Sequence, residues 1–184
     1  MVILGFDPGL ATLGYGVIKT DPKGRSSMVD YGIISTPKEE NLAERLCHLE
    51  KGVKEVIDTF KPDEIAIEEL FFAKNVKTGI AVAHARGVLI LTAMKLCGRI
   101  FEYTPLQIKQ ALTGYGRADK HQIQAMVQTF LGLKNIPRPD DAADALAVAL
   151  THAQTNKFGG LFSVGNAPGN YTLSGDDNNI RRKV

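Results

Sequence analysis

The first 35 residues alternate short apolar runs with turn residues, which is the pattern of an antiparallel strand meander. Residues 2–6 form an apolar run that ends at Asp7-Pro8-Gly9. Residues 14–19 and 28–35 have the composition of strands, and the turn sequence Asp21-Pro-Lys-Gly24 separates them. We therefore expect three antiparallel strands at the start of the chain.

Beyond residue 41 the apolar positions recur at the spacing of an amphipathic helix. Asn41 is suited to cap the start of this helix, and Lys61-Pro62 ends it. Residues 64–68 then have the pattern of a brief strand. The apolar face of the helix consists of Leu42, Leu46, Leu49, Val53, Val56, Ile57 and Phe60.

Strands and helices alternate along the rest of the domain, which is typical of an α/β fold. We expect a mixed five-stranded sheet, with three antiparallel strands followed by parallel strands, flanked by helices. Asp119, with Gln122 three residues later, has the pattern of a helix cap. The remaining predicted elements are a long small-residue helix over 73–97, a strand over 99–103, a helix from Pro105, a helix that opens at Asp119 and ends at Gly132, and a helix over 140–154 capped by Asp140.

Length and composition favour one compact domain. The chain has 184 residues, of which 44% are hydrophobic and 23% charged, within the ordinary range of globular proteins. We expect this domain to span residues 1–157. Because the sequence beyond it becomes rich in glycine, asparagine and serine, residues 158–184 are expected to form a disordered tail. No signal-peptide pattern and no uninterrupted apolar span are present, so we expect a soluble, cytoplasmic protein.

Positive charge is concentrated in the middle of the chain. The net charge of +2 is too small to indicate a nucleic-acid partner by itself. Residues 74–121, however, contain eight basic and two acidic residues, an excess of six positive charges. The remainder of the chain is therefore net acidic.

Two carboxylates end apolar strands. Asp7 follows the first apolar run, and Glu68 ends the sequence Ile-Ala-Ile-Glu. An unpaired charge at such a position is costly to bury unless a cation or hydrogen bonds compensate it. If the two strands are neighbours, both side chains emerge at a similar level, which suits a metal site. The alternative for Asp7 is a simple turn-forming role in Asp-Pro-Gly.

Two further carboxylates lie three residues apart at the start of the last predicted helix. Asp141 and Asp144 therefore share one helical face, with Cβ atoms roughly 5 to 6 Å apart. Like charges this close favour a bound cation. The alternative for Asp141 is a favourable interaction with the helix dipole, of about 0.3 to 1 kcal/mol. This explanation does not extend to Asp144, which lies beyond the first helical turn.

Four oxygen donors without histidine or cysteine favour a hard cation, Mg²⁺ or Mn²⁺, over zinc. The chemistry indicated is phosphoryl transfer. Two such ions about 4 Å apart activate a water molecule and stabilise the leaving 3′-oxygen of an in-line displacement, without a protein nucleophile. Phosphodiester hydrolysis of this kind leaves a 5′-phosphate and a 3′-hydroxyl.

Several short motifs together resemble the RuvC family of Holliday junction resolvases. Their order and spacing match the family over residues 1 to about 155. Each motif is weak alone, but the combination in one small domain is specific. The motifs are Gly5-Phe-Asp-Pro-Gly9 with Gly14-Tyr-Gly16, Ala66-Ile-Glu68 followed by Phe71 to Asn75, Ala85-Arg-Gly87, and Asp141-Ala-Ala-Asp-Ala-Leu-Ala147.

The resemblance implies a ribonuclease H-like fold and a homodimer that cuts a four-way DNA junction by paired symmetric nicks, in recombination and repair. It implies two Mg²⁺ ions per active site, with Mn²⁺ as a substitute, and the branch-migration proteins RuvA and RuvB as partners. Some relatives have histidine in place of the third carboxylate, whereas this chain has Asp141. Matched position by position, the catalytic and metal-binding residues are Asp7, Glu68, Asp141 and Asp144.

The resemblance also implies DNA contacts. Lys109 and Lys120 match basic residues near the cut phosphate; the alternative is that they are solvated surface lysines. Phe71 matches an aromatic residue that stacks on an opened base, unless it packs in the core. Lys74 and Arg86 are further expected DNA contacts. Arg86, with the nearby glycines of its helix, has a dimer contact or internal packing as alternatives.

Three other functions fit parts of this pattern. An actin-like or sugar-kinase-like ATPase also opens with an aspartate at a strand end, but such chains need two domains and are usually far longer. A resolvase-like nuclease that processes ribosomal RNA shares the first and last aspartates, but residues 71–75 and 141–144 favour the junction resolvase. A catalytically inactive junction-binding protein is disfavoured because all four carboxylates are present.

Overall fold

One six-stranded mixed sheet forms the centre of the molecule, in a computed structural model that describes residues 1–69, 76–157 and 171–172. The strand order is β3-β2-β1-β4-β5-β6. β1 to β3 form the predicted antiparallel meander, and β1, β4 and β5 are parallel. The strands are β1 Val2–Asp7, β2 Thr12–Thr20, β3 Ser26–Ser35, β4 Glu64–Glu68, β5 Arg99–Tyr103 and β6 Tyr171–Thr172.

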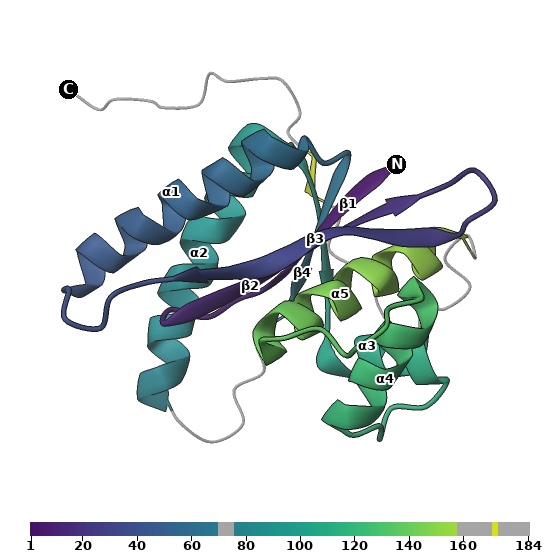
Figure 1. Cartoon of the computed structure of the whole chain (residues 1–184). Helices are drawn as coiled ribbons and strands as arrows, with labels where there is room; N and C mark the ends of the chain where they lie inside the picture. Colours follow the sequence, from purple (N-terminus) through teal and green to yellow (C-terminus); the bar gives the residue numbers. More distant parts are fainter. Residues whose placement is uncertain (70–75, 158–170, 173–184) are drawn as a thin grey trace.

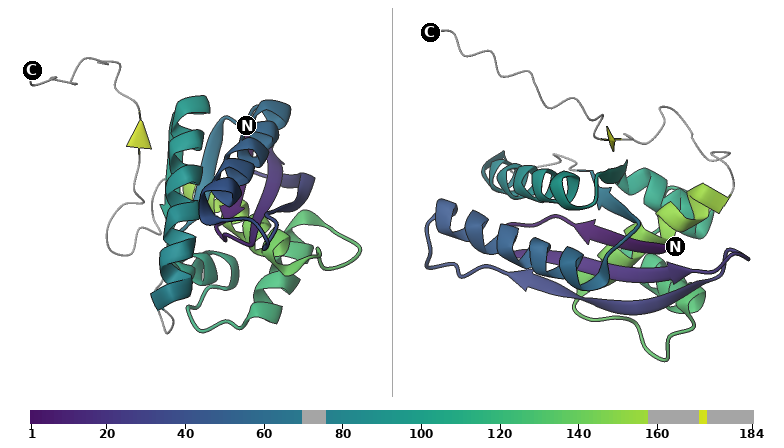
Figure 2. Two further views of the ribbon diagram at one scale, coloured as in Figure 1. Left: turned by 90° about the vertical axis from the view of Figure 1, so that its left-hand side faces the viewer. Right: turned by 90° about the horizontal axis from the view of Figure 1, so that it is seen from above.

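Helices cover both faces of the sheet, so the fold has three layers (Figure 1, Figure 2). α1 and α2 lie against one face, and α3, α4 and α5 cover the other. Each face has its own cluster of buried apolar side chains, one around Phe6 and Val53 and the other around Tyr103 and Leu146. The helices are α1 Leu42–Phe60, α2 Val76–Leu96, α3 Pro105–Thr113, α4 Lys120–Leu131 and α5 Asp140–Lys157.

The mixed five-stranded sheet predicted from the sequence is confirmed by β1 to β5. The two residues of β6 add a short antiparallel strand at the β5 edge, where Tyr171 pairs with Ile100. They belong to the segment expected to be a disordered tail, and the rest of residues 158–184 lies outside the described residues. Its disorder stays a prediction.

Local capping signals define the helix boundaries. The Asn41 side chain accepts from the Glu44 N–H at 3.1 Å, and Asp119 accepts from the Gln122 N–H at 2.8 Å. Both predicted caps are thus confirmed, as is the end of α4 at Gly132 in the left-handed conformation. Asp140, in contrast, is the first residue of α5, and its carboxylate contacts other side chains rather than the N–H groups of the helix.

Glycines allow α5 to lie unusually close to the sheet. A Cβ atom on Gly14 of β2 would lie 2.0 Å from the carbonyl oxygen of Asp141, and one on Gly5 of β1 would lie 2.2 Å from that of Ala145. Real Cβ atoms do not make such contacts, so any larger residue forces the helix away from the strands. Ala142, Ala143 and Ala145 through Leu150 of α5 are buried in this contact.

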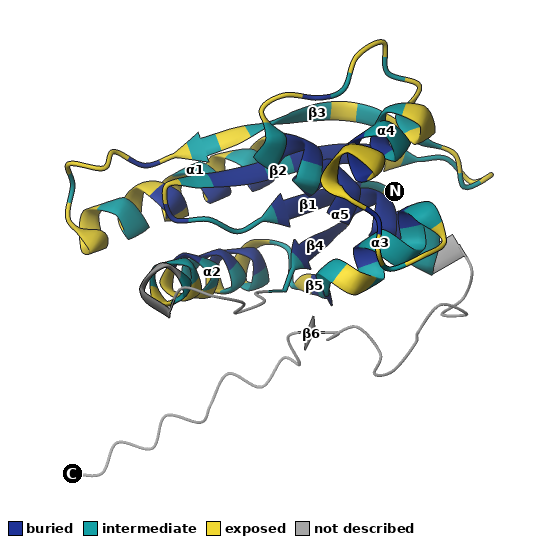
Figure 3. Cartoon of the chain, turned by 90° about the horizontal axis from the view of Figure 1, so that it is seen from below, coloured by how far each residue is buried: buried dark blue, intermediate teal, exposed yellow. Residues whose placement is uncertain are grey.

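Exposed residues gather on the outer surfaces of the helices and along β3, while β1 and β4 are buried (Figure 3). α2 is the exception to the usual polar exterior. Its inner side is buried at Ala85 and Leu89, but Ile80 and Leu91 are 52% and 56% exposed.

Among the described residues, one segment, Gly79–Leu96 of α2, is long and apolar enough to span a membrane by length and composition. Its packing against α1 and the sheet buries 22% of that segment.

Replacing Gly14 with alanine is expected to lower the free energy of unfolding by about 1 to 3 kcal/mol, because the added methyl group overpacks the contact with α5. Urea denaturation of the purified variant measures this change. Gly116→Ala is the matched control. Its Cβ would meet the Cδ1 atom of Leu106, an exposed side chain that can rotate away, so a change within about 0.5 kcal/mol is expected. Equal stabilities of the two variants would contradict the proposed close contact.

Candidate metal centre

Asp7 and Glu68 lie side by side at one edge of the sheet. Each is the last residue of its strand, and β1 and β4 are parallel neighbours in a register that pairs Phe6 with Ile67. The next residue of each strand therefore emerges at the same level. Both side chains are half-buried, and they lie close enough for a hydrogen bond between the two carboxyl groups.

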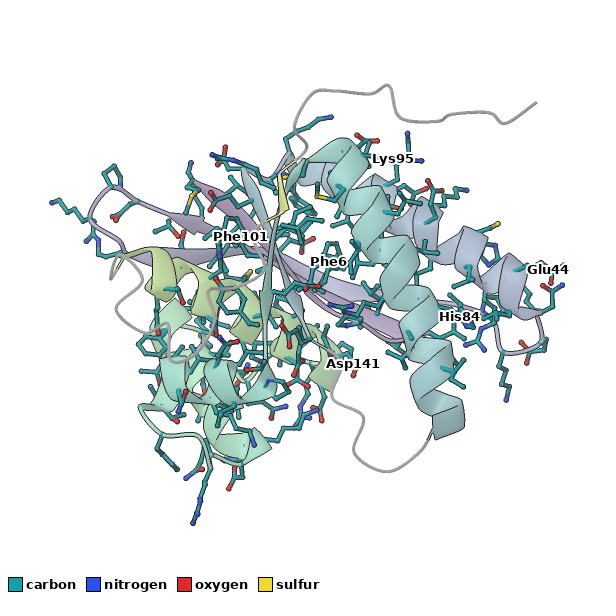
Figure 4. The ribbon with its side chains drawn as sticks, turned by 180° about the vertical axis from the view of Figure 1, so that it is seen from behind. Phe6, Glu44, His84, Lys95, Phe101 and Asp141 are labelled. Atoms are coloured by element: carbon teal, nitrogen blue, oxygen red, sulfur yellow. The ribbon has the colours of Figure 1, made fainter. Side chains whose placement is uncertain are left out.

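α5 brings the two other predicted carboxylates to this edge. Asp7 pairs with Gly14 across β1 and β2, and Gly14 is where the backbone of Asp141 comes closest to the sheet. Asp141 therefore reaches the end of β1, between α2 and the α3–α5 layer (Figure 4). Carboxylate oxygens of Asp7, Asp141 and Asp144 lie within 4.8 Å of one another. Glu68 flanks this group on the β4 side.

Burial and repulsion from neighbouring carboxylates make Asp7, Glu68 and Asp144 hard to ionise. Burial, and then the charges of Glu68, Asp144 and Asp141, raise the pKa of Asp7 to about 8. Burial and the charge of Asp144 raise the pKa of Glu68 to about 7. The pKa of Asp144 is also raised, chiefly by burial. At neutral pH the cluster thus needs protons or a cation to balance its charge.

The donor set fits a hard divalent cation. All the side chains that converge here offer carboxylate oxygens, which Mg²⁺ and Mn²⁺ prefer. Such a cation would displace the protons that Asp7 and Glu68 hold at neutral pH because of their raised pKa values. Asp7 is central to the arrangement because it neighbours Asp141 and Asp144 on one side and Glu68 on the other.

Lys120 and Lys109 lie beside the carboxylates. The Nζ atom of Lys120 is 2.8 Å from Oδ2 of Asp144 and 3.4 Å from Oδ2 of Asp140. Asp140 also pairs with Arg138 and accepts from Gln124, so it holds Lys120 instead of capping α5. Both lysines line a cleft of about 180 Å³ together with Glu68 and Asp144. The structure therefore brings these two predicted site residues together with the carboxylates.

The other predicted DNA contacts have different positions. Arg86 is largely buried between α2 and β5, where its guanidinium pairs with the buried carboxylate of Glu102. This contact matches the alternative of internal packing, and a DNA contact by Arg86 stays a prediction. Phe71 and Lys74 lie outside the described residues.

Sequence reasoning missed Arg45, which lies near the cluster on its other side. Arg45 lines a second cavity, of about 550 Å³, together with Asp141 and the loop of residues 9–12. In the sequence it is an ordinary polar residue on the outer face of an amphipathic helix. No local signal relates it to Asp7, because the two meet only when α1 packs beside the loop that follows β1.

The raised pKa values predict how pH affects the metal-free protein. The folded state holds protons on Asp7 and Glu68 up to pH about 8 and about 7, whereas the unfolded chain releases them near 3.8 and 4.5. The folded state therefore binds more protons between these limits, and its stability falls as the pH rises from 5 towards 8. Thermal unfolding in EDTA is expected to show a lower Tm at pH 8 than at pH 5.5.

Asp7→Asn is the informative variant for this effect, because it removes one ionisation at constant size. Its Tm in EDTA is expected to fall less than that of the wild type as the pH rises. At pH 8 its Tm should exceed the wild-type value by several degrees, because removing the repulsion stabilises the folded state by about 1 to 2 kcal/mol. Mg²⁺ is expected to raise the wild-type Tm more at pH 8 than at pH 5.5. A pH-independent Tm in EDTA would contradict the proposed repulsion.

The sequence of the chain matches a known family over most of its length. The family model described as "Crossover junction endodeoxyribonuclease RuvC" matches residues 3–152. A protein of that name from Alkaliphilus oremlandii is 53% identical over 164 residues, which cover 89% of this chain and 99% of the relative. Another from Clostridioides difficile is 51% identical over 158 residues, covering 86% and 93%.

Solved structures agree with the sequence match. The RuvC structure from Thermus thermophilus is 35% identical, with a TM-score of 0.81 over 94% of this chain and all of that one. RuvC from the same organism in complex with a Holliday junction substrate matches with a TM-score of 0.82. The yeast mitochondrial Holliday junction resolvase, at 11% identity and a TM-score of 0.61, shares the fold. The expected ribonuclease H-like fold is confirmed, and the chain belongs to the RuvC family of crossover junction endodeoxyribonucleases.

Proposed function

We propose that this protein cuts four-way DNA junctions by metal-dependent phosphodiester hydrolysis, as paired symmetric nicks that leave 5′-phosphate and 3′-hydroxyl ends. The observation that carries the proposal is the convergence of four carboxylates and two lysines at one sheet edge, in a chain that shares fold and sequence with a junction-bound RuvC. The cellular process is recombination and DNA repair in the cytoplasm. Neither the ribosomal RNA nuclease nor the ATPase is favoured by this combination.

Asp7, Glu68, Asp141 and Asp144 are proposed to hold Mg²⁺, two ions per site, with Mn²⁺ as a substitute. When bound, Mg²⁺ would supply an activated water and would stabilise charge on the leaving 3′-oxygen. The residues themselves provide a rigid, partly buried set of oxygen donors, because β1, β4 and α5 are all anchored in the core. Rigid placement matters because catalysis by positioning is lost with displacements of about 1 Å.

Lys109 and Lys120 are proposed to bind the phosphate at the cut site. They line the same cleft as Glu68 and Asp144, so a phosphate there would lie between lysine ammonium groups and the metal ligands. Lys120 is held in place by Asp144 at 2.8 Å, which limits the side-chain entropy lost on binding. Positive charge at this position stabilises the negative charge that builds up in the transition state. Phe71, Lys74 and Arg86 remain proposed DNA contacts.

A homodimer is proposed to place two such sites on one junction. Ile80, Gly87 and Leu91 lie on one face of α2 at helical spacing, exposed to solvent. Exposed apolar surface of this kind marks an interaction site, and a second copy of the chain would cover it. RuvA and RuvB are further proposed partners, from the family alone.

The nuclease proposal is tested with a synthetic four-way junction, Mg²⁺ and the variant Asp7→Asn. Mutation of a residue that only supports a metal ligand lowers metal affinity or activity by about 10- to 100-fold. Loss of a ligand itself is therefore expected to lower the nicking rate by more than about 100-fold. Gel electrophoresis of end-labelled strands measures the nicks, and a mobility shift in EDTA measures binding, which Asp7→Asn should retain. Junction cleavage by Asp7→Asn at the wild-type rate would rule out the proposed site.

The dimer is tested with Leu91→Glu. A buried charge at the centre of an apolar interface is expected to raise the dimer dissociation constant about 10-fold or more, measured by analytical ultracentrifugation. Leu106→Glu is the matched control, since Leu106 is 55% exposed and lies on α3, on the opposite side of the sheet. The control should associate like the wild type. Unchanged association of Leu91→Glu would place the interface elsewhere.

A further inference from the structure

A second cavity adjoins the carboxylate cluster on the side away from the two lysines. It is lined by residues 9–12 of the loop after β1, by Arg45 of α1, by Ala81 and Val82 of α2, and by Asp141, with a volume of about 550 Å³. The lysine cleft is lined by Glu68 at the end of β4 and by α3, α4 and α5. Because these helices cover opposite faces of the sheet, the two hollows flank the carboxylates, and Asp141 belongs to the second one.

Arg45 is held in this cavity by a buried hydroxyl. Its Nε–H donates to Oγ1 of Thr36 at 2.9 Å, and that hydroxyl donates to the carbonyl of Leu10 at 2.6 Å. The N–H of Thr36 also donates to the carbonyl of Ala11 at 3.1 Å. Thr36 is 7% exposed, so its bond to Leu10 is buried, while its bond to Arg45 is partly buried. One residue thus fixes both the loop after Asp7 and the orientation of the guanidinium.

The charge of Arg45 is not paired with a carboxylate in the described part of the chain. Among the residues the structure describes, no carboxylate lies within 4.0 Å of its guanidinium, and the one bond it makes is through Nε. Its two terminal nitrogens make no hydrogen bond or ion pair with the described residues, and Arg45 lines the cavity. A guanidinium in this state is suited to bind a phosphate through two parallel N–H donors.

We propose that Arg45 binds a backbone phosphate of the cleaved strand, next to the phosphate that is cut. The inference rests on the proposed junction nuclease activity. A strand that crosses the carboxylates would meet Lys109 and Lys120 on one side and Arg45 on the other. Two fixed contacts, one on each side of the metal site, would hold the reacting phosphate in register along the strand.

Salt dependence of junction binding tests the proposal. Affinity is measured by fluorescence anisotropy in EDTA, so that nothing is cut, at several salt concentrations. One phosphate contact contributes about 0.9 to the slope of log K against log salt. Arg45→Gln is expected to lower that slope by about this amount per site and to weaken binding about 10-fold. Lys23→Gln is the control, because Lys23 carries the same charge in the exposed β2–β3 turn, at the other end of β1 from Asp7.

A second arm separates a phosphate contact from a structural role. Single neutral methylphosphonates are placed at each position around the cut site. At one position flanking the cut, a methylphosphonate is expected to weaken binding by the wild type and to leave binding by Arg45→Gln unchanged. Arg45→Lys keeps the positive charge, so it is expected to retain the salt slope but to lose part of the affinity. The inference about Arg45 would be overturned if Arg45→Gln had the same slope of log K against log salt as the wild type. It would also be overturned if methylphosphonates weakened binding by both proteins equally at every position. Neither result would affect the proposed nuclease function. Failure of the wild type to bind or cut any junction would overturn the proposed function as well.

Discussion

The close contact between α5 and the first two strands is the constraint on which the rest of the molecule depends. Glycine at positions 5 and 14 removes the side chains that would separate helix from sheet. The small residues that α5 presents then pack almost backbone to backbone on β1 and β2. Because Gly14 faces Asp7 across the hairpin, the same contact that buries α5 also delivers Asp141 and Asp144 to the end of β1. The contact of α5 with β1 and β2 therefore both packs the core and positions the carboxylates.

That interface carries an electrostatic cost. Asp7, Glu68 and Asp144 are partly removed from water, and repulsion from neighbouring carboxylates raises their pKa values further. Protons balance this charge in the metal-free protein, a bound divalent cation would replace them, and Lys120 neutralises part of it. Functional sites commonly lower the free energy of unfolding in this manner, and the packing of the surrounding core compensates for the loss.

Features set by local chemistry could be predicted from the sequence. The caps at Asn41 and Asp119, the alternation of strands, and the placement of Asp7 and Glu68 at strand ends all follow from neighbouring residues. What could not be predicted depends on contacts between distant segments. Asp140 was expected to cap α5 but instead joins Arg138 and Lys120, and Arg86 pairs with Glu102. The Thr36–Arg45 bond likewise exists only because α1 returns beside the loop after β1.

The separation of the carboxylates along the chain also determines when the proposed metal site can form. Asp7 and Glu68 are made early in translation, whereas α5 is the last of the described helices to leave the ribosome. Until then the sheet face that α5 covers is open, and no cluster can form around Asp7. A chain without α5 therefore lacks the carboxylate cluster, and the proposed metal site forms in the same event that closes the core.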